Sequence, residues 1–170
     1  MSDEYGETIG VDEEQLFEQE LDGGQALSGP PLVPEGYHEA VLQEVTLEVN
    51  RSDESKGIRP FIRWQYQVIE GEFAGRTLRN DTYLTQNAFW TYMNTLRAFG
   101  YTKQQLAEEA GWTPRKALEY ATSLVGDKVC LLIKHNSAKS TDRFTGEEDR
   151  RTYANINGIY PTGWAERNAV

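Results

Sequence analysis

Apolar and polar residues alternate in two segments of the chain, residues 37–49 and residues 58–69. A period of two is typical of a strand with one buried face. The apolar positions of the first segment are Tyr37, Val41, Val45, Leu47 and Val49. Those of the second segment are Ile62, Trp64, Tyr66 and Val68. We therefore predict two strands joined by a polar turn, with Trp64 and Tyr66 in the core.

After the second strand the pattern predicts a connection, a third strand and then a helix. Residues 70–75 carry two glycines, as hairpin loops often do, and a third strand is expected at residues 76–84. Between residues 86 and 99 the apolar positions recur every three or four residues, which is typical of a helix with one buried face. They are Phe89, Tyr92, Met93, Leu96 and Phe99. Trp90 and Arg97 flank this apolar face, and we expect them to pack against neighbouring elements.

Two further helices and two strands are expected in the rest of the chain. Thr102 and Gln105 form a capping-box pair that predicts a helix start. Thr113 followed by Pro114 predicts another. Residues 125–135 alternate again, and we predict a strand there. A polar loop at residues 136–149 and a last strand at residues 150–159 should follow.

The predicted order of elements is three strands, a group of helices and two more strands. A five-stranded OB barrel has this order, with its helical element between strands three and four. We therefore predict a mainly β fold with a helical insertion, an OB-type barrel over residues 36–170. Residues 1–35 are expected to be a disordered acidic tail and linker.

Charge is distributed unevenly between these two regions. The chain has 17 basic and 27 acidic residues, a net charge of −10. Residues 1–28 hold nine of the acids and no base, so the remainder has 18 acids against 17 bases, a net charge of −1. Within the acidic segment, Leu16, Phe17 and Leu21 can share one side of a short helix capped by Asp12. This segment is either a solubilising tail or a partner-binding motif.

An OB barrel binds extended nucleic acid across its second and third strands and the loops beside them. Single-stranded DNA requires cations for its phosphates and aromatic faces for its bases. The candidate phosphate ligands at these places are Arg59, Arg63, Arg79, Lys139, Arg143 and Arg151. The candidate stacking residues are Phe61, Tyr83, Phe144 and Tyr153. The alternative for the strand residues is an ordinary solvated sheet face, although such faces seldom carry large aromatic side chains.

Enzymatic, metal-binding and membrane functions are not expected. No P-loop, G-x-S-x-G, H-E-x-x-H or C-x-x-C motif occurs, and one cysteine with two histidines offers few metal ligands. Cys130 lies in the apolar run 129–133, which predicts a buried thiol. That run has five residues, far fewer than a membrane span requires. No cofactor is therefore expected, and the composition favours a soluble intracellular protein.

Five stretches of the sequence resemble one family of phage-encoded proteins. They are residues 36–40 (GYHEA), 51–57 (RSDESKG), 61–64 (FIRW), 68–76 (VIEGEFAGR) and 96–100 (LRAFG). The most specific stretch is EGEFAGR, which follows an alternating strand. The family was long catalogued as a domain of unknown function, and its members look like OB-fold single-stranded DNA-binding proteins. The resemblance covers residues 34–160.

The resemblance implies a protein that coats exposed single strands during phage DNA replication, recombination or repair, in the cytoplasm of an infected bacterial cell. The expected partners are single-stranded DNA, replication or recombination proteins on the acidic tail, and further copies of the chain. Many such proteins carry their acidic tail at the C-terminus, whereas the acids lie at the N-terminus of this chain. We expect this tail to recruit partners or to compete with DNA. The alternative function is a protein-interaction module or a DNA mimic that inhibits a host protein.

Overall fold

The computed structural model describes residues 13–21 and 31–168, and the chain divides into two compact units, Met1–Pro31 and Leu32–Val170. In the first unit, residues 13–17 are helical, and Leu16, Phe17 and Leu21 are all exposed. Asp12, the expected helix cap, lies outside the described residues, as do positions 1–11 and 22–30 of the expected tail and linker.

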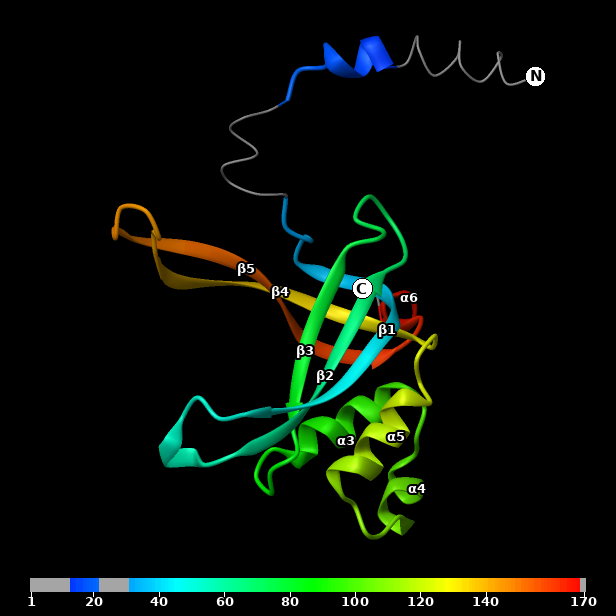
Figure 1. The fold of residues 1–170 in the computed structure, drawn as a ribbon. Coiled ribbons are helices and arrows are strands. Elements are labelled where there is room, and N and C mark those ends of the chain that lie inside the picture. The colour runs from blue at the N-terminus through cyan, green and yellow to red at the C-terminus, as the bar shows by residue number, and fades with distance from the viewer. Residues whose placement is uncertain (1–12, 22–30, 169–170) are drawn as a thin grey trace, which may run out of the picture. The chain divides into compact units, whose positions relative to one another are not determined.

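The second unit is built on one five-stranded antiparallel sheet in the order β3-β2-β1-β4-β5. Its strands are β1 (Gly36–Asn50), β2 (Arg59–Val68), β3 (Thr77–Tyr83), β4 (Lys128–Thr141) and β5 (Glu148–Pro161). Its helices are η1 (Glu54–Lys56), α3 (Phe89–Ala98), α4 (Lys103–Glu108), α5 (Pro114–Thr122) and α6 (Trp164–Asn168). The prediction of a mainly β fold is confirmed. Helices α3, α4 and α5 follow β3 in the chain and gather beside one end of the sheet (Figure 1).

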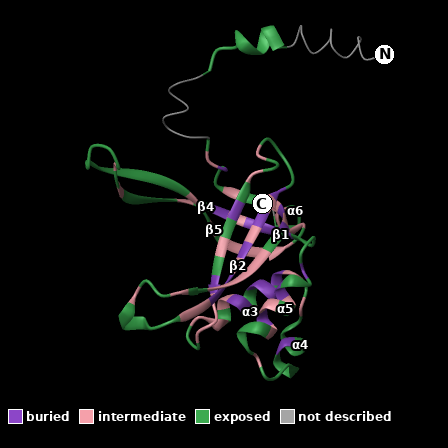
Figure 2. Cartoon of the chain, viewed as in Figure 1, coloured by how far each residue is buried: buried purple, intermediate pink, exposed green. Residues whose placement is uncertain are grey.

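The core lies between one face of the sheet and helices α3 and α5. The predicted apolar face of β2 is confirmed, because Ile62, Trp64, Tyr66 and Val68 are all buried. Each such side chain contributes about 1.5–3 kcal/mol by leaving water. The buried indole Nε1 of Trp64 donates a hydrogen bond of 2.9 Å to Thr82 Oγ1 on β3. Figure 2 shows the buried residues concentrated in the centre of the sheet and on the inner sides of these helices.

The helix starts predicted from capping residues are present. The Thr102 side chain accepts a hydrogen bond from the Gln105 backbone, and the Gln105 side chain accepts one from the Thr102 backbone. Thr113 caps α5 in the same way by accepting from the Lys116 backbone. The Tyr92 hydroxyl donates a 2.9 Å hydrogen bond to the carbonyl oxygen of Ala117, which fastens α3 to α5.

The predicted apolar face of β1 is wrong in its first half. The register of β1 against β2 shifts between Leu42 and Glu44, which is a β-bulge. Before the shift the buried residues are Ala40 and Leu42, so Tyr37 and Val41 lie on the other face. The extra residue of a bulge exchanges the two faces of a strand, and Val45 therefore packs against the core. Val49, near the end of the strand, is exposed.

The expected polar loop at residues 136–149 is largely a β-hairpin. Strand β4 continues to Thr141 and β5 begins at Glu148, so only residues 142–147 form the connection. The Asp142 carboxylate accepts hydrogen bonds from the backbone of Phe144 and Thr145, which fixes this turn. Most side chains of this outer hairpin are exposed on both of its faces (Figure 2). It therefore lacks the apolar alternation by which a strand is recognised from sequence.

Candidate nucleic-acid interface

The candidate site is centred on the face of β2 and β3 that points away from the core. Cross-strand pairing places Phe61 opposite Tyr83, Arg63 opposite Asp81 and Gln65 opposite Arg79. The intervening β2 residues, Ile62 and Trp64 among them, point into the core, so these pairs form the outer face. In Figure 1 the β1–β2 and β4–β5 hairpins both project toward the left of the view, the β4–β5 hairpin above and the β1–β2 hairpin below. The face is thus flanked by two long hairpins.

Phe61 lies on this outer face but does not present its ring to solvent, which corrects the expectation of a free stacking surface. Its side chain is 5% exposed. The ring of Tyr83 lies 5.1 Å away and the Arg63 guanidinium 5.3 Å away, and together they cover it. Phe61 thus supports the residues that cover it and has no free face for a base.

Tyr83 is the half-buried aromatic residue at the centre of this cluster. Its hydroxyl accepts a 2.8 Å hydrogen bond from Asn50 Nδ2 at the end of β1. The Arg59 guanidinium lies 4.9 Å from the Tyr83 ring centroid, a cation–π distance. Arg59 is itself partly buried, and its Nε has no hydrogen-bond partner among the described residues. Arg59, Phe61 and Tyr83 therefore form one fixed group at the base of the β1–β2 hairpin.

Arg63 is held by two carboxylates, which corrects the expectation of a free phosphate ligand. Its Nε lies 3.0 Å from Asp81 Oδ1, and its Nη1 lies 3.2 Å from Glu48 Oε2. A second hydrogen bond of 3.3 Å runs from Nη2 to Asp81 Oδ2. The hydrogen bonds to Asp81 raise the pKa of Arg63 above its ordinary value. A phosphate can contact this guanidinium fully only by displacing one of the carboxylates.

Arg79 and Tyr153 are brought together by the structure, although they lie on different strands. A groove of about 690 Å³ runs between β3 and the middle of β5, and both residues line it together with Gln65, Asn80 and Asn155. Arg79 is exposed and has no ion pair among the described residues. Tyr153 is 44% exposed. An available cation and an available aromatic ring thus line one polar groove.

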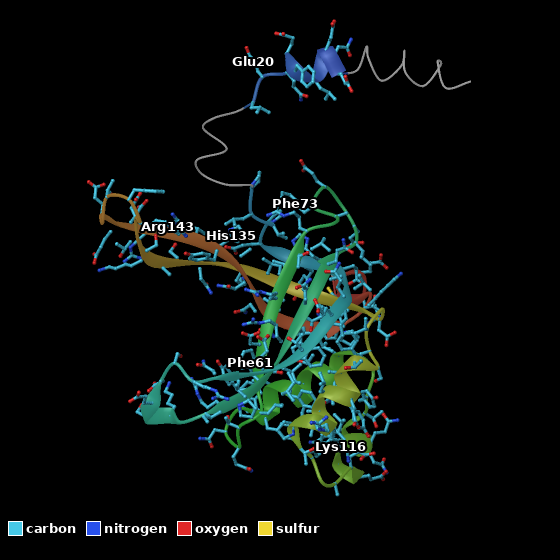
Figure 3. All side chains as sticks on the ribbon, viewed as in Figure 1. Glu20, Phe61, Phe73, Lys116, His135 and Arg143 are labelled. Carbon is cyan, nitrogen blue, oxygen red and sulfur yellow. The ribbon has the colours of Figure 1, made fainter. Side chains whose placement is uncertain are left out.

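The outer β4–β5 hairpin carries the remaining candidates, which do not form one surface. The strand register pairs Lys139 with Arg150, and Arg151 with Ala138, so Lys139 and Arg151 point to opposite faces. Tyr153 shares its face with Arg151. Phe144, at the tip, is 92% exposed. Figure 3 shows Arg143 at the far end of this hairpin, well away from Phe61.

The outer hairpin is close to neutral in charge. Its cations are Lys139, Arg143, Arg150 and Arg151, and its acids are Asp142, Glu147, Glu148 and Asp149. Lys139 lies 3.9 Å from Glu148 across the strands, and both are largely exposed. The backbone hydrogen bonds that Asp142 accepts from Phe144 and Thr145 lower the pKa of its carboxyl. The hairpin therefore offers an exposed aromatic tip and separate cations, without a uniform basic surface.

Trp90 is an exposed aromatic residue, which corrects the expectation that it packs against a neighbouring element. Its side chain is 64% exposed on α3, and Arg97 is exposed as well. The residues of α3 that face the core include Tyr92 and Leu96. The spacing could have revealed the opposite stripe, because Trp90, Asn94 and Arg97 are separated by four and three residues and so share one side of a helix.

No group of three metal-ligating side chains occurs among the described residues. Cys130 is buried as expected, and burial raises the pKa of its thiol to about 11. No helix within residues 13–21 and 31–168 is long and apolar enough to cross a membrane. No known protein-family model matches the chain, and no curated protein has a matching sequence.

Proposed function

We propose that this protein is an OB-fold protein that binds single-stranded DNA without sequence preference. The sheet order β3-β2-β1-β4-β5 supports the OB assignment, because an OB barrel opened at its seam between strands three and five has these neighbours. A groove lined by residues of both β3 and β5 lies where that seam would be. The observation that carries the proposal is the joint presence of Arg79 and Tyr153 in this groove.

The distribution of cations supports a polyanionic ligand despite the acidic total. Eleven of the 17 basic residues lie on β2, on β3 and the turn before it, in the β1–β2 turn, or in the β4–β5 hairpin beyond Ile133. They are Arg51, Lys56, Arg59, Arg63, Arg76, Arg79, Lys134, Lys139, Arg143, Arg150 and Arg151. Exposed rings at Tyr153 and Phe144 add stacking surfaces, each worth about 1–3 kcal/mol when a base lies on it. Cations with interspersed aromatic rings suit a single strand better than a duplex, whose bases are covered.

The biological setting of the proposal is phage DNA metabolism. The protein would protect exposed strands during replication, recombination or repair in the cytoplasm of an infected bacterium, without a cofactor and without catalysis. The sequence resemblance supports this setting, and the open sheet with two long hairpins is compatible with it.

Substitution of the two groove residues tests the proposal. Arg79→Gln and Tyr153→Ala are each expected to weaken binding of fluorescently labelled oligo-dT, measured by anisotropy. Arg79→Gln should also reduce the slope of log affinity against log salt by about 0.7, the value for one phosphate contact on a single strand. Arg115→Gln is the matched control, because Arg115 is an exposed arginine on α5, outside the groove. Equal affinities for all four proteins would refute the proposed site.

The exposed Leu16, Phe17 and Leu21 favour an additional role for the acidic segment in binding a replication or recombination protein. The same segment can compete electrostatically with DNA, since residues 1–28 carry nine acids and no base. Removal of residues 1–28 should therefore tighten oligo-dT binding at low salt, and the difference should disappear at high salt. Unchanged affinity at low salt would exclude competition by the tail.

A further inference from the structure

A second groove lies between α3 and the C-terminal part of β5. It encloses about 840 Å³ and is lined by aromatic and amide side chains from several elements. Those that bear on its chemistry are Trp90, Asn94, Tyr101, Asn157, Tyr160 and Trp164. The rings of Tyr160 and Trp164 stack on each other at 4.9 Å, so this wall of the groove is already packed. Trp90, in contrast, has no ring contact among the described residues.

Trp90 is the largest exposed apolar side chain of the second unit. Tryptophan has the largest apolar surface of any side chain, and here 64% of the residue is exposed to water. A ligand that covers the indole would remove this surface from water and so bind more tightly. Within this groove the indole has polar neighbours, since Asn94 follows one helical turn later. An exposed flat ring among amide groups suits a ligand that is flat on its faces and polar on its edges. A nucleic-acid base has both properties.

The charges lining the groove favour an anion. Its two cations are Arg97 on α3 and Lys103 at the start of α4, and both are exposed with no ion pair among the described residues. The one carboxylate in the lining is Asp81, whose charge is offset in part by Arg63 at 3.0 Å, a guanidinium that it shares with Glu48. The groove is therefore locally positive in a protein whose net charge is −10.

The second groove continues the first. Asn80 and Asp81 of β3 line both of them, so the two meet at this strand. The track formed in this way begins at Tyr153 and Arg79 and ends at Trp90, Arg97 and Lys103. A strand that leaves the first groove along β3 thus reaches Trp90 by passing the amide of Asn80 and the carboxylate of Asp81, which is paired with Arg63.

We propose that this groove binds the continuation of the same single strand, with a base stacked on Trp90 and phosphates held by Arg97 and Lys103. The inference rests on the proposed function, since it extends the DNA track by one subsite. It makes α3 a part of the binding surface in addition to its role in the core. It also predicts that the occupied length of DNA exceeds what the outer face of β2 and β3 covers alone.

Tryptophan fluorescence and salt dependence test this subsite on the full-length chain. Trp64 is buried, Trp112 lies outside the groove, and the ring of Trp164 is already stacked on Tyr160, so quenching by oligo-dT should come mainly from Trp90. Trp90→Phe should remove most of the quenching but retain most of the affinity, since a phenyl ring still stacks. Trp90→Ala should weaken binding of an oligo-dT of about 30 nucleotides by about five- to a hundred-fold. Thermal unfolding of both variants should match the wild type, because the side chain is exposed.

Substitution of Arg97 and Lys103 tests the subsite independently, through the salt dependence of binding. The double variant Arg97→Gln, Lys103→Gln should reduce the log–log salt slope by about 1.4, which corresponds to two phosphate contacts. Arg115→Gln again serves as the control and should leave the slope unchanged. If the wild type binds oligo-dT and both Trp90→Ala and the double variant keep its affinity and slope, the subsite is refuted and the proposed function stands. If the wild type does not bind oligo-dT at all, the proposed function and the proposed subsite are both refuted.

Discussion

Asp81→Asn should release Arg63 and increase affinity for single-stranded DNA. Asp81 holds Arg63 through two hydrogen bonds on the outer face of β2 and β3. Asparagine keeps the size of the side chain and removes its charge, so the guanidinium becomes available to a phosphate. Arg63 retains Glu48 at 3.2 Å and does not become an isolated charge. The substitution also removes the one carboxylate shared by the two grooves, and with it a repulsion of DNA.

The expected changes in stability and in DNA affinity are both small, because the Arg63–Asp81 pair is partly exposed to water. The side chains of Arg63 and Asp81 are about one-third exposed, so the ion pair contributes only about 0.5 kcal/mol to the free energy of unfolding. One added phosphate contact should steepen the log–log salt slope by about 0.7. A charged hydrogen bond at such exposure is worth about 1 kcal/mol, or about fivefold in affinity. DNA binding should thus improve while stability falls slightly.

Anisotropy titrations of oligo-dT over a range of salt concentrations measure this effect. The matched control is Glu109→Gln, which changes the net charge equally and breaks the 2.7 Å ion pair between Lys116 and Glu109 near α5. The control should leave the salt slope unchanged. Equal slopes for Asp81→Asn and the wild type would show that DNA does not pass over this face, and the reasoning would fail.

Three further predictions concern buried side chains. Thr82→Val should lower the free energy of unfolding by about 1–3 kcal/mol in urea, because it leaves the buried Trp64 Nε1 without an acceptor, and a loss below about 0.5 kcal/mol would contradict this. Phe61→Ala should cost about 3 kcal/mol of stability, and a variant as stable as the wild type would show that this ring is not buried in solution. Cys130 has a thiol pKa raised to about 11 by burial, so its contribution to stability is complete below about pH 8.5 and declines as the pH rises toward 11. A thiol reagent at about pH 8 should accordingly label the folded protein slowly and the urea-unfolded protein fast, and equally fast labelling would contradict its burial.

Local signals in the sequence were sufficient for much of the fold. The apolar face of β2 could be predicted because β2 is regular over its whole length and buries one face completely. The starts of α4 and α5 could be predicted because capping acts within three residues. The bulge in β1 could not, since it depends on pairing with β2 and leaves no mark in the alternation of β1 itself. The strand expected at residues 150–159 is present within β5, but the outer part of β4, residues 136–141, was missed because polar residues occupy both faces of the outer hairpin.

The candidate site was predicted less well, because its properties depend on contacts between strands. The sequence places Arg63 on an outer face, but only the register of β2 with β3 places Asp81 opposite it. The same register puts Tyr83 over Phe61 and thereby buries a ring that alternation alone predicts to be exposed. The partnership of Arg79 with Tyr153 depends on the approach of β3 to β5, strands far apart in the sequence. Trp90 is the exception, because its helical spacing from Arg97 was visible in the sequence.

The binding of labelled oligo-dT by the full-length chain, compared with a duplex and with oligo-U over a range of salt, is the most direct test of the account. We expect oligo-dT to bind well above the duplex, with a log–log salt slope of about −0.7 for each phosphate contacted. Failure to bind oligo-dT, or equal binding of the duplex, would contradict the account. The exposed Leu16, Phe17 and Leu21 would then direct the search to a protein partner.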